Sequence, residues 1–364
     1  MDKQHREKSK IMFIVTSLSS KGGAERVMVS LANWIVKNDI GYEPIFLIFD
    51  RKKSAYQIDN GVRVIRPTSD YSKNRITALW QRIRFCKKMV RAEKPNYIVS
   101  FFAKTTFYAK LASKGNSIII GSERANPNTK SKLEKIMDVL AFKMCDGFIF
   151  QTSGVKKIFK DAKNKSTVIP NPINEKTLSV DDLAKERRII AVGRLTGQKG
   201  FDVLIDAFKK VSEKNPDYEL TIFGEGEDRE KLLKQIHDLG LDKRAKLMGR
   251  SDSIADEMSK SKIFVLSSRY EGMPNVLIEA MASGVACVST DCDYGPSDLI
   301  ENGVNGILVD VDNVDQMADA INELISDDEK RKILEKNAYK INEKLSPDVI
   351  YRKYLDYIVG KHIK

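Results

Sequence analysis

The chain has 364 residues, which at about 100 to 200 residues per domain is enough for two domains. Its 42% hydrophobic and 31% charged residues are typical of a soluble globular protein and exclude disordered, collagen-like and disulfide-scaffold proteins. The 62 basic and 50 acidic side chains give a formal charge of +12, which indicates an anionic partner: a nucleic acid, a membrane surface or a phosphorylated substrate.

The cysteines and the N-terminus bear on the cellular compartment. Cys86, Cys145, Cys287 and Cys292 form no Cys-x-x-Cys pair, so neither a disulfide framework nor a zinc site is expected. Residues 1–10 lack the apolar core of a signal peptide, and no apolar run reaches the roughly 18 residues that span a bilayer. We therefore expect a cytoplasmic protein whose membrane contact is peripheral.

The first half of the chain alternates short apolar runs with helical patterns. Strands are expected at residues 11–15, 43–49, 62–66, 97–102, 117–121 and 147–151, and the first helix at 24–37. The pattern at 75–91 predicts a basic amphipathic helix with apolar positions Ile76, Leu79, Trp80, Ile83, Met89 and Val90. Such a helix can lie on anionic lipid or clasp a lipid diphosphate, or it can bury the apolar stripe on the sheet and leave its basic face solvated.

The second half repeats this alternation. Strands are expected at 188–192, 219–223, 245–248, 263–267 and 286–290, with helices at 201–214, 229–239, 275–283 and from Val314 onward. Near-continuous apolar strands that alternate with helices indicate parallel sheets covered on both faces. Each half is therefore expected to be a doubly wound α/β domain, with ligands outside the carboxyl ends of the strands and the cleft between the domains as the default site.

The Pro-rich segment 169–172 marks the expected boundary between the two domains. Residues 1–172 hold 33 basic and 14 acidic side chains, a formal charge of +19, whereas the remainder holds 29 basic and 36 acidic ones, a charge of −7. The first domain, 1–172, is therefore expected to face an anionic surface or acceptor. The second domain is expected at 173–346, followed by a C-terminal helix within 347–364.

The motif from Glu271 to Glu279 carries the strongest chemical signal. Pro274 stands just before the expected helix, whose first amide groups can bind an anion such as a diphosphate. Glu271 lies in the preceding loop and Glu279 about one turn inside the helix, so one carboxylate could meet a sugar and the other a ribose. The same pattern also fits an ordinary helix that Gly284 caps, with two solvated glutamates.

Three Gly-containing loops accompany this motif. In the first, Arg194 and Lys199 flank a turn after a strand and can converge on one diphosphate, although such a basic turn is often simply solvated. The second is Gly224-Glu225-Gly226, a weak signal by itself. The third contains Gly22 and Gly23 before a helix, where a ligand could approach the backbone or the chain could merely turn tightly.

These four motifs, in their order along the chain from the Gly22-Gly23 loop to Glu279, resemble those of the retaining glycosyltransferases of family 4, which have the two-domain GT-B fold. The resemblance implies transfer of a sugar from a nucleotide diphosphate sugar with retained anomeric configuration, without a required metal or cofactor. It also implies that the C-terminal helix crosses back to the N-terminal domain. Arg194 and Lys199 would neutralise the departing diphosphate, Glu271 would contact the sugar and Glu279 the ribose. The other implied donor-binding residues are Gly22, Gly23, Gly193, Gly224, Arg250, Gly272, Met273, Pro274, Asn275 and Val276.

The segment 121–127 resembles one found in family members that extend polyprenyl-diphosphate-linked sugars for bacterial surface polysaccharides or glycans. Ala125 departs from the Asn that is often found there. By this resemblance Glu123 and Arg124 lie on the acceptor side. Because none of the three histidines falls in a suitable loop, Glu123 also stands as a candidate catalytic residue in place of the family's histidine.

The expected function is thus that of a peripherally membrane-associated glycosyltransferase on the inner face of the membrane. We expect a UDP-hexose or UDP-N-acetylhexosamine donor and a lipid-diphosphate-linked saccharide acceptor. A glycosyltransferase of the same family with a soluble or simple lipid acceptor is the alternative. A nucleic-acid-binding protein is disfavoured, because the basic residues are not interleaved with an aromatic stacking platform and no nucleic-acid-binding module is present.

Overall fold

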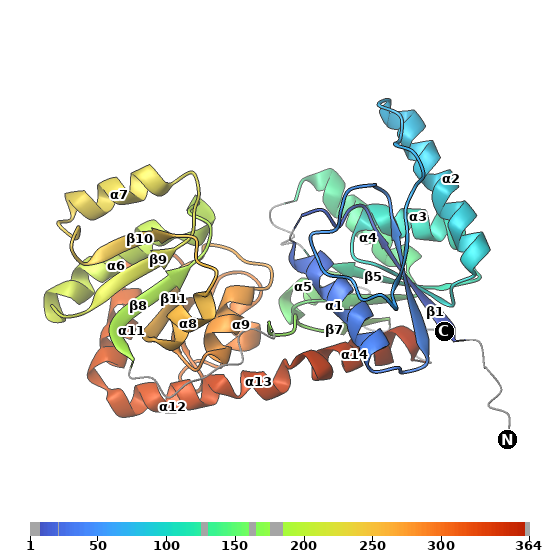
Figure 1. Ribbon diagram of the computed structural model, residues 1–364. Helices are drawn as coiled ribbons and strands as arrows, with labels where there is room; N and C mark the ends of the chain where they lie inside the picture. Colours follow the sequence, from blue (N-terminus) through green and yellow to red (C-terminus); the bar gives the residue numbers. More distant parts are fainter. Residues whose placement is uncertain (1–7, 21, 125–129, 160–164, 175–184, 361–364) are drawn as a thin grey trace, which may run out of the picture. The chain divides into compact units, whose positions relative to one another are not determined.

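The computed structural model describes residues 8–20, 22–124, 130–159, 165–174 and 185–360. The chain divides into two compact units, coloured blue to green and yellow to red in Figure 1 except for the C-terminal helix. The first unit comprises residues 1–151, 155–170 and 350–364, and the second comprises 152–154 and 171–349. Ala125, where the sequence departs from the family pattern, lies outside the described residues.

A parallel sheet forms the centre of the first unit. Among the described residues it has seven strands in the order β3-β2-β1-β4-β5-β6-β7. Its central strands are almost fully buried, since each is a run of apolar residues with helices nearby. The strands are β1 (Ser9–Val15), β2 (Tyr42–Ile48), β3 (Arg63–Ile65), β4 (Tyr97–Ser100), β5 (Ile118–Glu123), β6 (Gly147–Phe150) and β7 (Ser166–Val168).

Helices surround this sheet (Figure 1). They are α1 (Gly23–Lys37), α2 (Arg75–Glu93), α3 (Ala103–Ser113), α4 (Lys132–Met144), α5 (Ser153–Ile158) and the C-terminal α14 (Pro347–Val359). α14 belongs to the first unit from Ile350 onward, and the rings of Tyr351 on α14 and Trp34 on α1 lie 6.0 Å apart. The chain thus returns to the first unit after completing the second.

The second unit is built around another parallel sheet. Its six strands, counted within the described part of the chain, have the order β10-β9-β8-β11-β12-β13. The strands are β8 (Glu186–Val192), β9 (Glu219–Phe223), β10 (Ala245–Gly249), β11 (Ser261–Leu266), β12 (Ala286–Thr290) and β13 (Ile307–Val309). The helices are α6 (Phe201–Lys214), α7 (Arg229–Asp238), α8 (Ile254–Ser259), α9 (Asn275–Ala282), α10 (Pro296–Leu299), α11 (Val314–Ser326), α12 (Asp328–Tyr339) and α13 (Ile341–Lys344).

The two parallel α/β units confirm the fold class expected from the alternating patterns. The structure does not support the alternative in which the whole apolar stripe of α2 is buried on the sheet. Ile76 and Trp80 are 69% and 66% exposed, whereas the buried positions of the helix are Ala78, Cys86 and Val90. Sequence periodicity placed the stripe on one face, but only the C-terminal part of that face meets the core.

Two further observations concern the membrane and the cysteines. No described helix is long and apolar enough to cross a membrane. The four cysteines are free and buried, and burial raises the pKa of the Cys86, Cys145 and Cys292 thiols to about 12.

Candidate active site

The candidate site residues of the second unit gather at one edge of its sheet. The loop 193–200 follows β8 and the loop 267–274 follows β11, and these strands are hydrogen-bonded neighbours. Because parallel neighbours end at the same edge of a sheet, the two loops meet. The sequence patterns identified both loops but not that they contact each other.

Hydrogen bonds fix the two loops together. The Ser267 hydroxyl donates to the Lys199 carbonyl at 2.8 Å, and the Arg269 amide donates to the Gln198 carbonyl at 2.8 Å. Gly200, with φ of +60°, lies so close to Ser267 that a Cβ atom would come within 2.1 Å of its carbonyl oxygen. The turn therefore requires glycine at this position, for both its backbone conformation and its lack of a side chain.

At the junction of these loops, Lys199 and Glu271 form an ion pair. Lys199 Nζ lies 2.6 Å from Glu271 Oε1, and the Ser268 hydroxyl donates to the same oxygen at 2.6 Å. The side chains of Lys199 and Glu271 are only 14% and 8% exposed. The alternative of a solvated basic turn and a solvated glutamate is therefore wrong for this pair. The sequence predicted both residues as site residues but missed that each is the other's partner.

The start of α9 lies next to this ion pair in the chain. Pro274 precedes the helix, and Gly272 and Pro274 pack against Gly295, where a Cβ atom would lie 2.5 Å from Pro274 Cδ. The side chain of Asn275, the first residue of α9, accepts a hydrogen bond from Asn171 at 2.7 Å. Met273 is buried, whereas Val276 and Glu279 are half-buried.

A pocket of about 370 Å³ opens at the carboxyl ends of β8, β9 and β10. Gly193, Arg194, Gly224 and Arg250 line it, together with Glu225 and Ser251. Gly224, with φ of +146°, packs so tightly on Gly193 that a Cβ atom would lie 1.8 Å from the Gly193 carbonyl oxygen. The structure thus brings four of the predicted donor-binding residues to one pocket, whose wall depends on a glycine at position 224.

The first unit holds the remaining site candidates. Gly22 precedes α1, and the Tyr56 hydroxyl bridges its peptide groups: it accepts from the Gly22 amide and donates to the Gly22 carbonyl at 2.6 Å. Burial raises the pKa of the Tyr56 hydroxyl. Gly23 begins α1 itself. Sequence reasoning missed Tyr56, since nothing in the local pattern links it to a loop 34 residues away.

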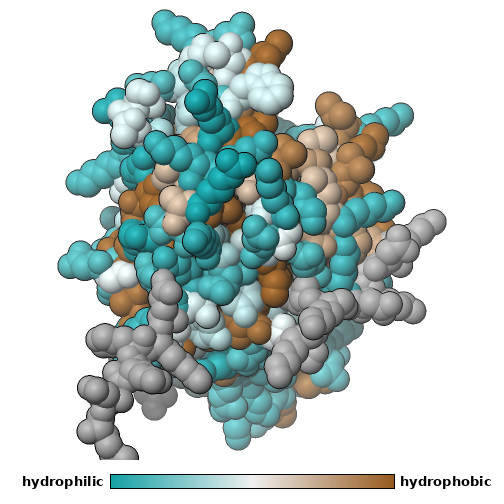
Figure 2. All heavy atoms as spheres, turned by 90° about the vertical axis from the view of Figure 1, so that its right-hand side faces the viewer, coloured by the Kyte–Doolittle hydropathy of each residue, from teal (hydrophilic) through white to brown (hydrophobic). Residues whose placement is uncertain are grey.

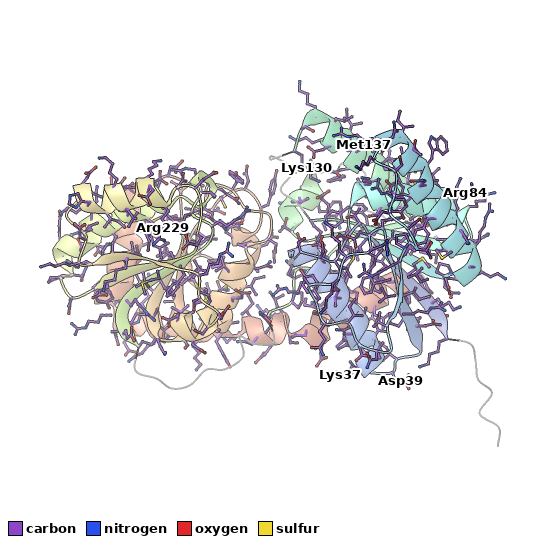
Figure 3. All side chains as sticks on the ribbon, turned by 45° about the horizontal axis from the view of Figure 1, so that its top comes forward. Lys37, Asp39, Arg84, Lys130, Met137 and Arg229 are labelled. Carbon is purple, nitrogen blue, oxygen red and sulfur yellow. The ribbon has the colours of Figure 1, made fainter. Side chains whose placement is uncertain are left out.

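Glu123 and Arg124 lie at the end of β5 with different environments. Glu123 is buried, and its carboxylate lies 2.8 Å from Nζ of Lys130. The same Nζ lies 2.6 Å from the carboxylate of Asp138 on α4. Lys130 is labelled in Figure 3. The guanidinium of Arg124 lies 4.0 Å from the centre of the Phe101 ring and donates to the Tyr354 hydroxyl. Burial lowers the pKa of Arg124. The side chain of Arg124 therefore anchors α14.

No cluster of three or more His, Cys, Asp or Glu side chains in the described part of the chain is placed to hold a metal ion.

Two family models match the chain. Residues 21–177 match the model described as Glycosyltransferase Family 4, and residues 174–341 match the model described as Glycosyl transferases group 1. The first match spans the Gly22 loop and the Glu123 segment, and the second spans the donor-site loops and α9. Together the two matches cover most of the chain.

Two curated relatives match almost the whole length of the chain. The amylovoran biosynthesis glycosyltransferase AmsD of Erwinia amylovora is 26% identical, over 96% of this chain and 99% of its own. The N-acetylgalactosamine-N,N'-diacetylbacillosaminyl-diphospho-undecaprenol 4-alpha-N-acetylgalactosaminyltransferase of Campylobacter jejuni is 28% identical, over 96% of this chain and 100% of its own.

Solved structures share the fold. The lipopolysaccharide outer core galactosyltransferase WaaB, in its apo form, matches with a TM-score of 0.79 at 23% identity, over 97% of this chain and 99% of its own. Anabaena Alr3699/HepE in complex with UDP matches with a TM-score of 0.79 at 19% identity, over 95% and 98% of the two chains. The chain therefore belongs to the family 4 glycosyltransferases, and its two α/β units have the GT-B fold.

Proposed function

We propose that this glycosyltransferase moves a hexose or N-acetylhexosamine from a UDP-sugar to a lipid-diphosphate-linked saccharide. Transfer retains the anomeric configuration, needs no metal ion, and serves surface polysaccharide or glycan biosynthesis. The observation that carries the proposal is the buried Lys199–Glu271 pair between the β8 and β11 loops. Such a pair, beside a helix start and a pocket, provides a cation for a diphosphate and a carboxylate for a sugar.

We propose that Lys199 and Glu271 exchange each other for the donor when the donor binds. When the diphosphate of the donor binds, Lys199 leaves Glu271 for a phosphate oxygen, and the freed carboxylate accepts hydrogen bonds from hydroxyl groups of the sugar. Arg194, on the wall of the pocket, adds a second positive charge. Two cations and the amide groups at the start of α9 then stabilise the charge that grows on the departing diphosphate, the work that a metal ion does in other enzymes.

The choice of UDP and of the pocket for the nucleoside rests on two supports. Anabaena Alr3699/HepE, which shares the fold, was solved with UDP. In this chain the pocket of about 370 Å³ lies directly beside the Gly193 turn, so a nucleoside there would place its diphosphate near Lys199. Glu279, one turn inside α9, is proposed to contact the ribose.

The acceptor class rests on the relatives and on Glu123. The printed name of the Campylobacter relative specifies a diphospho-undecaprenol-linked saccharide, and that of AmsD specifies amylovoran biosynthesis. Glu123 is a buried carboxylate held by Lys130. We propose that it lies on the acceptor side and receives the proton of the acceptor hydroxyl.

Membrane association is proposed from exposed apolar side chains on two helices of the basic first unit. Figure 2 shows hydrophobic residues among hydrophilic ones on one face of this unit. On α2, Ile76 and Trp80 are exposed among six basic side chains, and on α4, Leu133 and Ile136 are 69% and 57% exposed beside exposed lysines. Apolar residues with basic neighbours favour the surface of an anionic membrane, here its cytoplasmic face.

A transfer assay tests the proposal. The protein is incubated with a panel of nucleotide sugars and either a polyprenyl-diphosphate-linked saccharide or the free saccharide, and the products are separated into lipid and aqueous phases. We expect transfer from a UDP-sugar to the lipid-linked acceptor only. Equal turnover of the free saccharide would favour the soluble-acceptor alternative and contradict the proposed acceptor class.

A further inference from the structure

The helix α9 is held at both ends by side chains from two segments in which the chain passes from one unit to the other. The first crossing segment is residues 169–173, where the first unit ends at Pro170 and the second begins at Asn171. The second crossing segment is residues 341–350, which run from α13 to the point where the first unit resumes at Ile350. Both attachments are hydrogen bonds from asparagine side chains within the second unit.

The first crossing segment binds the N-terminal end of α9. Asn171 is only 2% exposed, and its Nδ2 donates to Oδ1 of Asn275, the first residue of α9, at 2.7 Å. Asn171 stands between Pro170 and Pro172, and each proline restricts its own backbone and that of the residue before it. The direction of the Asn171 side chain is therefore set by a stiff backbone, and its bond transmits the position of this segment to the start of α9.

The second crossing segment binds the C-terminal end of the same helix. Nδ2 of Asn342 donates at 3.0 Å to the carbonyl of Ala282, the last residue of α9. The two crossing segments are also bonded to each other, since the Ile173 amide donates to the Leu345 carbonyl at 3.0 Å. The crossing segments and α9 are thus joined at three points.

We propose that Asn171 and Asn342 are positioning residues that fix α9 to the two crossing segments. The start of α9 then keeps its position relative to these segments. This inference rests on the proposed donor site, because it gives the amide groups at the start of α9 the task of stabilising the diphosphate. Such groups act only when they are held close to the position where charge develops, so a small shift of α9 lowers the rate of transfer.

Hydrogen-deuterium exchange tests the attachment without any substrate. The matched control is Asn215→Ala, since Asn215 at the end of α6 donates to Asn322 at 2.8 Å in the same unit but away from α9. We expect Asn171→Ala and Asn342→Ala to speed exchange in α9 by about five- to tenfold, the effect of losing one partly buried hydrogen bond to this helix. Exchange in α9 that is unchanged, or that rises equally in Asn215→Ala, would overturn the proposal.

Kinetics test the consequence for transfer. We expect Asn171→Ala to lower kcat about tenfold with KM for the donor changed less than twofold, and Asn215→Ala to leave both unchanged. The double variant Asn171→Ala/Asn275→Ala should lose no more kcat than Asn171→Ala alone, because both replacements remove the same hydrogen bond. Additive losses, or an unchanged kcat, would overturn it. A wild-type protein that turns over no nucleotide sugar would instead refute the proposed function, while the exchange measurement still decides the attachment.

Discussion

The replacement Glu271→Gln separates the two roles that the structure gives to the Lys199–Glu271 pair. Glutamine keeps the shape of the side chain and can still accept the hydrogen bond from Ser268. It removes the negative charge that holds Lys199 at 2.6 Å. We expect the variant to bind UDP more tightly than the wild type and yet to transfer sugar far more slowly.

The magnitude follows from the burial of the pair. Both side chains are less than one-fifth exposed. At an effective dielectric constant of about 20, two unit charges about 4 Å apart interact by about 4 kcal/mol. In the wild type this attraction is given up when Lys199 turns to the diphosphate, whereas the variant has no such attraction to lose. Solvation offsets most of the difference, and we expect about 1.4 kcal/mol to remain, which is about tenfold in affinity. Loss of the carboxylate as a partner of the sugar should lower kcat by about 10²-fold.

Isothermal titration calorimetry with UDP and a transfer assay measure the two effects. The matched control is Glu335→Gln, because Glu335 forms a comparable pair with Lys185 at 2.9 Å and does not line the pocket. That control should change neither UDP affinity nor kcat. Weaker UDP binding by Glu271→Gln would refute the exchange of partners, and a wild-type kcat would refute the role of the carboxylate.

Other replacements test the pocket, the membrane surface and the thiols. Gly224→Ala should weaken UDP binding at least tenfold, because its Cβ would lie 1.8 Å from the Gly193 carbonyl oxygen. Gly197→Ala is the control, since nothing lies within 4 Å of its Cβ position, and it should leave UDP affinity unchanged. Equal UDP affinities of the two variants would disprove the role of the packing at Gly224. Ile136→Glu on α4 should lower binding to anionic liposomes about tenfold in a sedimentation assay, and Ile333→Glu on α12 should not; unchanged binding excludes the α4 surface. Burial keeps the four thiols protonated, with pKa values raised from 9.0, so the unfolded chain releases protons first as the pH rises. The free energy of unfolding in urea should therefore fall above about pH 9, and a value that rises from pH 8 to pH 10 contradicts this reasoning.

The sequence predicted the fold because the strands are continuous apolar runs with helices between them. The expected helix at 201–214 and the strands at 219–223 and 286–290 agree with the structure residue for residue. Some short elements escaped prediction: β13 (Ile307–Val309) has only three residues, too few for a period to be recognised. For α2 the sequence left open whether the apolar stripe is buried, because helical spacing alone does not tell which part of a face meets the core.

Within the site, the sequence predicted the residues better than their contacts. Lys199 and Glu271 were each recognised in a loop motif, but their separation of 72 positions in the sequence hides the ion pair. The sequence did not identify Asn171 as a site residue, and its partner Asn275 lies 104 positions away in the sequence. Local spacing determines which groups a loop presents, whereas the order of strands in the sheet determines which loops meet. Only the topology, with β8 beside β11, places these groups together.

The most direct test of the central claim is the stoichiometry of a single turnover. Purified protein in excess is mixed with a labelled UDP-sugar and a polyprenyl-diphosphate-linked saccharide, and released UDP and labelled lipid are quantified together. The account predicts one labelled lipid product for each UDP released, and loss of both in Lys199→Met at unchanged folding. Release of UDP without labelled lipid, or full activity of Lys199→Met, would contradict it.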